Sequence, residues 1–374
     1  MLFLGSLAVY VRTAAPSVMA GDSAEFQMAA ALLGVPHPTT YPLYIMLGKL
    51  ATLVIPFYDL ARRVTLVSSF AAALAVAFMF LLARRVTGGT LSAVLAALAL
   101  AVAPGLWNAA TMAEVYALLA ALMAAFGYFL IADYRLQIAD WQNQGIDERR
   151  TTNDKGQQTD VAMPSARPLT VAAFIAGLAF SHHGLFAFTG MPLFAGYVLW
   201  RVLRRRTKDE GRMLSAPIVH RLSSIVKISI PLAVAFILGL TPWLYTLIQY
   251  AHYGPFHGED YGLPIHYFWG SPGSWVEAAN MLLGGAMRNG VFRMPTLEHA
   301  GTTMQFIGAR LLFEFGPLGC ALGALGCVAL LVRQRGVWLG AAAVFAGDVL
   351  YMLLGGAMRN GVFRMPTLEH AGTT

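Results

Sequence analysis

Long apolar runs separated by short polar segments limit what this chain can fold into more than any other feature. Nine such runs are found, at about 2–19, 64–83, 90–106, 113–131, 168–182, 184–200, 228–248, 309–332 and 337–354. Several approach the roughly 20 residues that an α-helix needs to cross the core of a bilayer. Only 12% of the 374 residues are charged, about half the share in soluble domains. The sequence therefore predicts an all-α, polytopic integral membrane protein of about nine transmembrane helices and excludes an ordinary soluble enzyme.

The distribution of basic residues predicts the orientation of these helices. A net charge of +7 would suggest nucleic-acid binding in a soluble protein. Here the basic residues lie between apolar runs and act as topology signals, so no nucleic-acid partner is predicted. With the N-terminus on the cytoplasmic side, 17 of the 26 Lys and Arg residues fall on that side, as the positive-inside rule favours. Segments 20–63 and 250–306 are then expected to contain outer loops, on the non-cytoplasmic face.

The domain organisation is expected to be a single transmembrane domain over residues 1–351. Residues 281–303 recur without a mismatch as residues 352–374. Structural repeats usually diverge in sequence while they keep their pattern, so an identical block at the end of the chain indicates a duplication or assembly artefact. We therefore assign no functional residue to 352–374.

The most informative polar segment is Gly-Asp-Ser-Ala-Glu-Phe at 21–26, followed by His-Pro-Thr-Thr-Tyr-Pro-Leu-Tyr at 37–44. Asp22 and Glu25 are three residues apart, so both can point the same way from a helix that starts here. A capping box with Asp22 at the N-cap would explain this spacing without any catalytic role. Alternatively, two carboxylates with His37 and Tyr41 beside a membrane surface form a group that can accept a proton from an incoming hydroxyl.

Three residues further along the chain carry the same two interpretations. Glu114 and Tyr116 stand at the start of a predicted span, where a glutamate also stabilises a helix N-terminus through the macrodipole. His183 lies within an apolar stretch, where it could hydrogen-bond a phosphate or a sugar, or pack as a neutral side chain.

The last polar segment supplies two more candidates. Trp269 could stack on a sugar face or belong to an interfacial aromatic belt. Arg288 could bind a phosphate in a bidentate manner or extend to lipid headgroups. Glu314 and Asp348 lie inside predicted spans but belong to no motif, so we leave them out of the predicted site.

These segments carry a family resemblance. Residues 21–26, 34–44 and 113–118 resemble bacterial members of the uncharacterised membrane-protein family related to the eukaryotic transmembrane protein O-mannosyltransferase. Residues 177–183, where His183 falls on the family's histidine, and 269–274 are further matches, and the resemblance covers roughly residues 5–330. Two positions depart from the family pattern: Thr40 replaces a glycine, and Gln249 stands where arginine is more frequent.

The resemblance implies a fold and an activity. Members look like GT-C glycosyltransferases, which implies transfer of a sugar, here mannose, from a polyprenyl-phosphate carrier to a protein, glycan or lipid hydroxyl on the non-cytoplasmic face. By motif, Asp22 is then the catalytic base and Glu25 an assisting carboxylate. The setting implied is the bacterial inner membrane. We predict no resident cofactor besides the lipid-linked donor, and dependence on a divalent metal stays open. The predicted substrate-binding residues are His37, Tyr41, Glu114, Tyr116, His183, Trp269 and Arg288, with no metal ligand among the predicted site residues.

Alternatives from other functional classes remain. The sequence has no Gly-x-x-x-x-Gly-Lys-Ser/Thr loop, no Cys-x-x-Cys and no His-Glu-x-x-His, so ATP-driven transport and zinc chemistry lack support. A glycolipid transporter or flippase should show symmetric halves, broken helices and charges in the membrane interior. A noncatalytic assembly subunit would tolerate the loss of Asp22.

Overall fold

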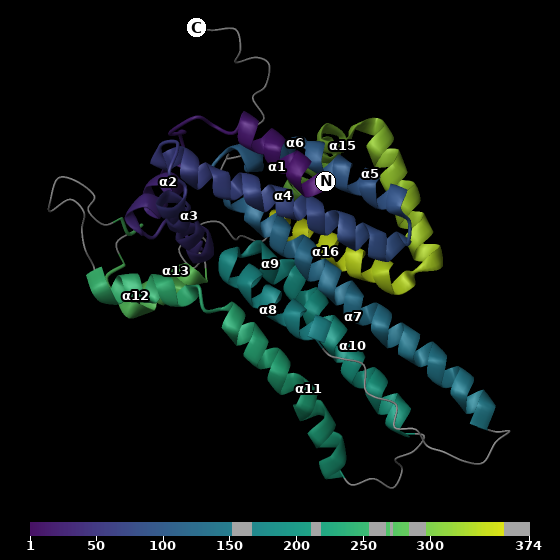
Figure 1. The fold of residues 1–374 in the computed structure, drawn as a ribbon. Coiled ribbons are helices and arrows are strands. Elements are labelled where there is room, and N and C mark those ends of the chain that lie inside the picture. The colour runs from purple at the N-terminus through teal and green to yellow at the C-terminus, as the bar shows by residue number, and fades with distance from the viewer. Residues whose placement is uncertain (152–166, 211–217, 254–266, 270–271, 284–296, 355–374) are drawn as a thin grey trace.

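The computed structural model describes residues 1–151, 167–210, 218–253, 267–269, 272–283 and 297–354. Every regular element in these ranges is a helix, and the one β-contact is an isolated parallel bridge between Val35 and Phe268. This confirms the predicted all-α class for the described residues (Figure 1). The helices are α1 (Leu2–Thr13), α2 (Asp22–Leu32), α3 (Pro42–Val54), α4 (Leu60–Thr87), α5 (Thr90–Val102), α6 (Pro104–Thr111), α7 (Val115–Thr151), α8 (Arg167–His182), α9 (Leu185–Phe188), α10 (Gly190–Glu210), α11 (Ile218–Gly239), α12 (Trp243–Tyr253), α13 (Trp275–Leu282), α15 (Leu297–Arg333) and α16 (Arg335–Leu353).

Each of the nine apolar runs falls on a helix, but fewer than nine helices are long enough to span a membrane. Five helices of the described chain are long and apolar enough, or up to seven if each of two bent pairs counts as one span. The other two runs fall on α1 and α8, of which 12 and 16 residues are described. Hydropathy identified the apolar segments, but the count of nine spans is not reached.

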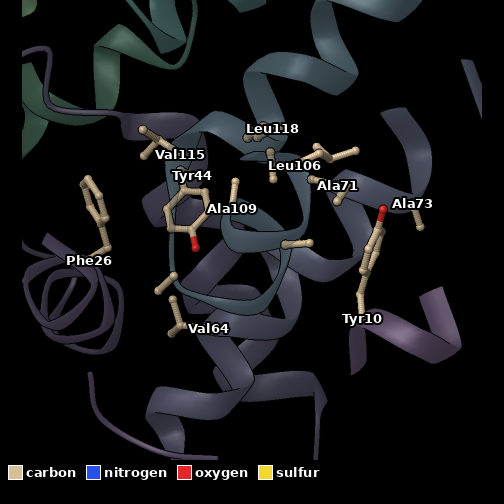
Figure 2. Packing of buried hydrophobic residues seen from close by; sticks show 14 of the residues in the cluster. Tyr10, Phe26, Tyr44, Val64, Ala71, Ala73, Leu106, Ala109, Val115 and Leu118 are labelled. Atoms are coloured by element: carbon tan, nitrogen blue, oxygen red, sulfur yellow. The ribbon is translucent and has the colours of Figure 1, made fainter. Parts of the chain in front are cut away.

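Helix α4 is the centre of the N-terminal half. It packs against α1, α2, α3, α5, α6 and α7. Its buried face is built from small residues, among them Ala71, Ala72, Ala73 and Ala75, which let neighbouring backbones approach closely. Figure 2 shows Ala71 and Ala73 in the same cluster as larger side chains such as Tyr10 and Tyr44.

Two helix pairs break rather than run straight. The axis bends by 59° between α5 and α6, where Pro104 opens the second helix, and by 47° between the end of α11 and α12. Proline lacks the N–H that would continue the first helix, so a new helix starts there with a new direction. The α5–α6 break matters for the site because α6 leads directly to Glu114.

The second half is organised around α8, which packs against α7 and α11. Between α7 and α10, the buried Arg201 guanidinium contacts the Asp133 carboxylate at 2.8 Å, and the Tyr197 hydroxyl donates to the same carboxylate at 2.6 Å. A buried ion pair of this kind is costly to break, because removing one partner leaves an uncompensated charge. It therefore ties α7 and α10 together near the middle of both helices.

Candidate carboxylate–histidine site

The site begins at the N-terminus of α2. The helix starts at Asp22 with Gly21 as its N-cap, and no side chain makes a capping hydrogen bond. The expected position of Asp22 at the N-cap is therefore wrong: the helix begins one residue earlier, and Asp22 occupies its first turn. Gly21 has a φ of 71°, a conformation that favours glycine, and this turn leaves the Asp22 side chain exposed. The capping interpretation of Asp22 is not supported by this geometry.

Glu25 is the most heavily hydrogen-bonded carboxylate of the site. Its Oε2 lies 2.5 Å from Nδ1 of His37, while its Oε1 accepts from the His37 backbone N–H at 2.9 Å and from the Tyr267 hydroxyl at 2.8 Å. Burial raises the pKa of the Glu25 carboxyl, but the His37 and Tyr267 contacts outweigh it and lower the pKa overall. Glu25 is therefore held as a carboxylate with both oxygens occupied.

Backbone hydrogen bonds join the loop after α2 to a segment more than two hundred residues further along the chain. Val35 donates its N–H to the Tyr267 carbonyl at 2.6 Å, and its own carbonyl accepts from the Trp269 N–H at 2.9 Å. Gly34 permits this approach, since a Cβ there would lie 2.6 Å from the Tyr267 carbonyl oxygen. The Tyr245 hydroxyl of α12 also donates to the Gly34 carbonyl at 2.8 Å. These contacts bring Tyr267 to Glu25.

The turn at Thr40 and Tyr41 explains one departure from the family pattern. Both residues have positive φ, 64° and 42°. Glycine adopts this region without strain, which accounts for the glycine in the family motif. Thr40 adopts it here with its side chain fully buried and its hydroxyl 3.0 Å from the hydroxyl of Thr246. The turn places the Tyr41 ring against His37, with centroids 5.2 Å apart.

Glu114 approaches the same site from the connection between α6 and α7. Its backbone is fixed by Ser68, whose hydroxyl accepts from the Glu114 N–H at 3.1 Å and donates to its carbonyl at 3.0 Å. Burial, and next the nearby Asp22 carboxylate, raise the pKa of Glu114 to about 7, while His37 acts in the opposite direction. Glu114 therefore sits in the cluster as a carboxyl group that is largely protonated at slightly acidic pH.

His183 closes the site on the α8 side. Its ring lies 5.7 Å from that of Tyr41 and 5.4 Å from that of Tyr116, and its Nδ1 accepts from the Leu185 N–H at 3.0 Å. Burial, followed by the neighbouring His182 and His37, lowers the pKa of His183 to about 3. His183 is thus neutral at physiological pH. It can hydrogen-bond a substrate but does not supply a positive charge for a phosphate.

The two candidates from the last polar segment have different outcomes. Trp269 is brought next to Val35, but through its backbone N–H. Arg288 lies outside the described residues. Tyr267 was not among the predicted site residues, although its hydroxyl reaches Glu25. The contact joins residues 242 apart in the chain, so no local pattern could have revealed it.

The cluster also has the composition of a cation site. One oxygen from each of Asp22 and Glu25 and one ring nitrogen of His37 lie within 4.8 Å of one another. Mixed oxygen and nitrogen donors suit several divalent transition metals. In this geometry three hydrogen bonds occupy three of the four lone-pair sites of the Glu25 carboxylate, and Nδ1 of His37 is already paired with Glu25. The side chains are arranged as a hydrogen-bonded set rather than as a ligand shell.

Fold and site together define a class: an all-helical integral membrane protein with a carboxylate–histidine cluster beside its candidate spans. A family model described as the N-terminal domain of protein O-mannosyl-transferase TMEM260 matches residues 22–208, half of the chain. The chain belongs to this family. The matched region contains Asp22, Glu25, His37, Glu114 and His183, whereas Tyr267 lies beyond it.

Two curated relatives give the same match. The protein named protein O-mannosyl-transferase TMEM260 in Mus musculus is 34% identical over 117 residues, which are 31% of this chain and 17% of the relative. The Dictyostelium discoideum protein of the same name is 29% identical over 120 residues, 32% of this chain and 15% of the relative. The matched stretch thus spans about a sixth of each relative. No solved structure matches this chain.

Proposed function

We propose that this chain is a membrane glycosyltransferase of the GT-C type that moves a sugar from a polyprenyl-phosphate carrier to an acceptor hydroxyl on the non-cytoplasmic face. The observation that carries this proposal is the convergence of Asp22, Glu25, His37 and Glu114 beside the candidate spans. The names of the relatives supply mannose as the sugar and a protein as the acceptor to test first. The bacterial inner membrane is the proposed setting.

The chemistry of sugar transfer fits this cluster. As the bond from C1 to the carrier phosphate breaks, positive charge develops on the sugar ring, and nearby carboxylates stabilise such charge. The acceptor hydroxyl must lose its proton as its oxygen bonds to C1, and we propose the exposed Asp22 carboxylate as a base for this step. A single displacement of this kind inverts the configuration at C1. Glu114, when protonated, can donate a hydrogen bond to a sugar hydroxyl.

Substituting Asp22 by Asn tests the proposal. The Asp22 side chain makes no hydrogen bond with the described residues, so Asn should fold equally well while it lacks the negative charge. We would reconstitute wild type, Asp22→Asn and the control Glu277→Gln, an exposed acid on α13, with labelled polyprenyl-phosphate mannose and a threonine-containing peptide. Transfer by wild type and the control, but none by Asp22→Asn, supports the proposal. Equal transfer by all three contradicts the role of Asp22.

One observation favours a second candidate function, a glycolipid transporter or flippase. The bends of 59° and 47° in two helix pairs resemble the broken helices of secondary transporters. Transporters place these breaks around midplane charges, and Glu314 of the candidate span Ala300–Arg333 does contact the first break at Gly105. The Asp22, Glu25 and Glu114 carboxylates, by contrast, lie outside the candidate spans. Movement of a fluorescent lipid-linked sugar across the vesicle bilayer, without release of the sugar, would favour this candidate over the transferase.

A further inference from the structure

The hydrogen bonds around Glu25 fix the protonation pattern of His37. Glu25 has a lowered pKa and no proton to donate, so the 2.5 Å contact to His37 requires a proton on Nδ1. In the neutral ring, the other nitrogen, Nε2, then carries the lone pair. Nothing in the described part of the chain hydrogen-bonds to Nε2, and the side chain is 13% exposed. His37 is therefore an oriented imidazole with its basic nitrogen available.

The surroundings of this imidazole are rich in acidic groups. The titratable side chains that face it come from five parts of the chain, and no Lys or Arg of the described residues forms an ion pair with them. The pair with Glu25 is the closest of these contacts. The facing groups are Asp22 and Glu25 of α2, Tyr41 before α3, Glu114 before α7, His183 after α8, and Tyr267.

We propose that His37 is a second general base of the transfer reaction, held in place by Glu25 as a carboxylate–imidazole dyad. This inference rests on the proposed function and changes the role of Glu25 from assisting base to orienting group. The acceptor hydroxyl gives its one proton to the Asp22 carboxylate as its oxygen bonds to C1, and Asp22 passes that proton on to Nε2 of His37. The bond from C1 to the carrier phosphate breaks with its electron pair leaving on the phosphate. The imidazolium then returns its proton to water.

A second base of this type gives the reaction a recognisable pH dependence. Only the neutral imidazole can take up a proton, so the part of the rate that uses His37 should rise with pH. Glu114, whose pKa is raised to about 7, changes charge over the same range whether or not His37 is present, so the contribution of His37 is the difference between the wild-type and His37→Gln profiles. Replacing Glu25 removes the group that orients the ring and should reduce this contribution.

The test is the pH profile of mannose transfer by wild type, His37→Gln, Glu25→Gln and the matched control His252→Gln, an exposed histidine on α12. We expect His37→Gln to lose about 100-fold of the rate at pH 7.5 and to show a smaller rise with pH than wild type. Glu25→Gln should also show a smaller rise, and His252→Gln should behave as wild type. A rise in His37→Gln equal to that of wild type overturns the inference.

A second measurement separates the dyad from the reaction itself. In ¹⁵N-histidine-labelled protein in detergent, His37 should carry its proton on Nδ1, with a far-downfield proton resonance that disappears in Glu25→Gln. Finding the proton of the neutral ring on Nε2 instead overturns the inference whether or not the protein transfers mannose. If wild type transfers no mannose although this signal is present, the proposed function fails and the dyad geometry stands.

Discussion

Glu114 is a carboxyl group of the site whose pKa is raised. Its pKa is raised to about 7 from an ordinary value of 4.5, chiefly by burial and then by Asp22. Because the folded state holds this proton more tightly than the unfolded state, its favourable contribution is complete below pH 4.5 and is lost as the pH rises to about 7. The loss amounts to at most about 3 kcal/mol.

Replacing Glu114 by Gln should remove this dependence. We expect the variant to match wild type in thermal stability near pH 4.5 and to exceed it at pH 8, since the amide is never charged. The measurement is the melting temperature of both proteins in detergent across pH 4 to 9. A difference between them that stays constant over this range would show that Glu114 is not the group that titrates.

Some residues of the site could be predicted from the sequence, and others could not. The motifs around Asp22, His37 and Glu114 indicate residues that the fold does bring together. Thr40 shows why the family motif carries a glycine, because its φ of 64° is positive. Tyr267 could not be inferred, because it reaches Glu25 only after the chain has folded.

At the scale of elements, α15 holds the broken pair α5–α6 through one carboxylate. Glu314 accepts from the Gly105 N–H at 2.8 Å, at the first turn of α6, and pairs with Arg310 at 2.5 Å. The first N–H groups of a helix have no partner within it, and a negative charge there is stabilising. Gly105 allows this, since a Cβ would lie 2.6 Å from the Glu314 Oε1. Because α6 leads to Glu114, this contact supports the site from outside it.

Replacing Glu314 by Leu should lower the free energy of unfolding by about 1–3 kcal/mol, because the Gly105 N–H loses its acceptor and Arg310 its partner. Glu314→Gln is the matched control: it keeps an oxygen that can accept from Gly105 and should lose clearly less. Thermal melts of the two variants beside wild type measure this. Equal losses would indicate that charge, and not the hydrogen bond, holds α6.

The elements were easier to predict than their ends. Each apolar run falls on a helix because burying apolar side chains away from water leaves a strong compositional signal. The bend at Pro104 comes from a single proline, which a count of apolar residues does not register. Counting apolar runs therefore predicts nine spans, whereas five to seven are found in the described chain.

At the scale of the whole molecule, the position of the site along α4 places it near one face of the bilayer. Helix α4 has 28 residues, about 42 Å, enough to connect the two faces of a bilayer. The site lies near its first end, since Gln27 of α2 donates to the Thr65 hydroxyl at 3.2 Å. Two arginines lie at each end of α4, Arg62 and Arg63 near the site and Arg84 and Arg85 at the other end, so the predicted outer position of the site rests on the charge balance of the whole chain.

Cysteine labelling can test this orientation, because Cys320 and Cys327 are the only cysteines in the chain. In a background with both replaced by Ala, we would introduce single cysteines at Phe57, before α4, and at Thr90, just after it; both positions are exposed. A membrane-impermeant maleimide should label Phe57→Cys in intact cells and Thr90→Cys only after permeabilisation. The reverse pattern would place the Asp22 cluster on the cytoplasmic face, where a donor and acceptor of the proposed kind could not meet it.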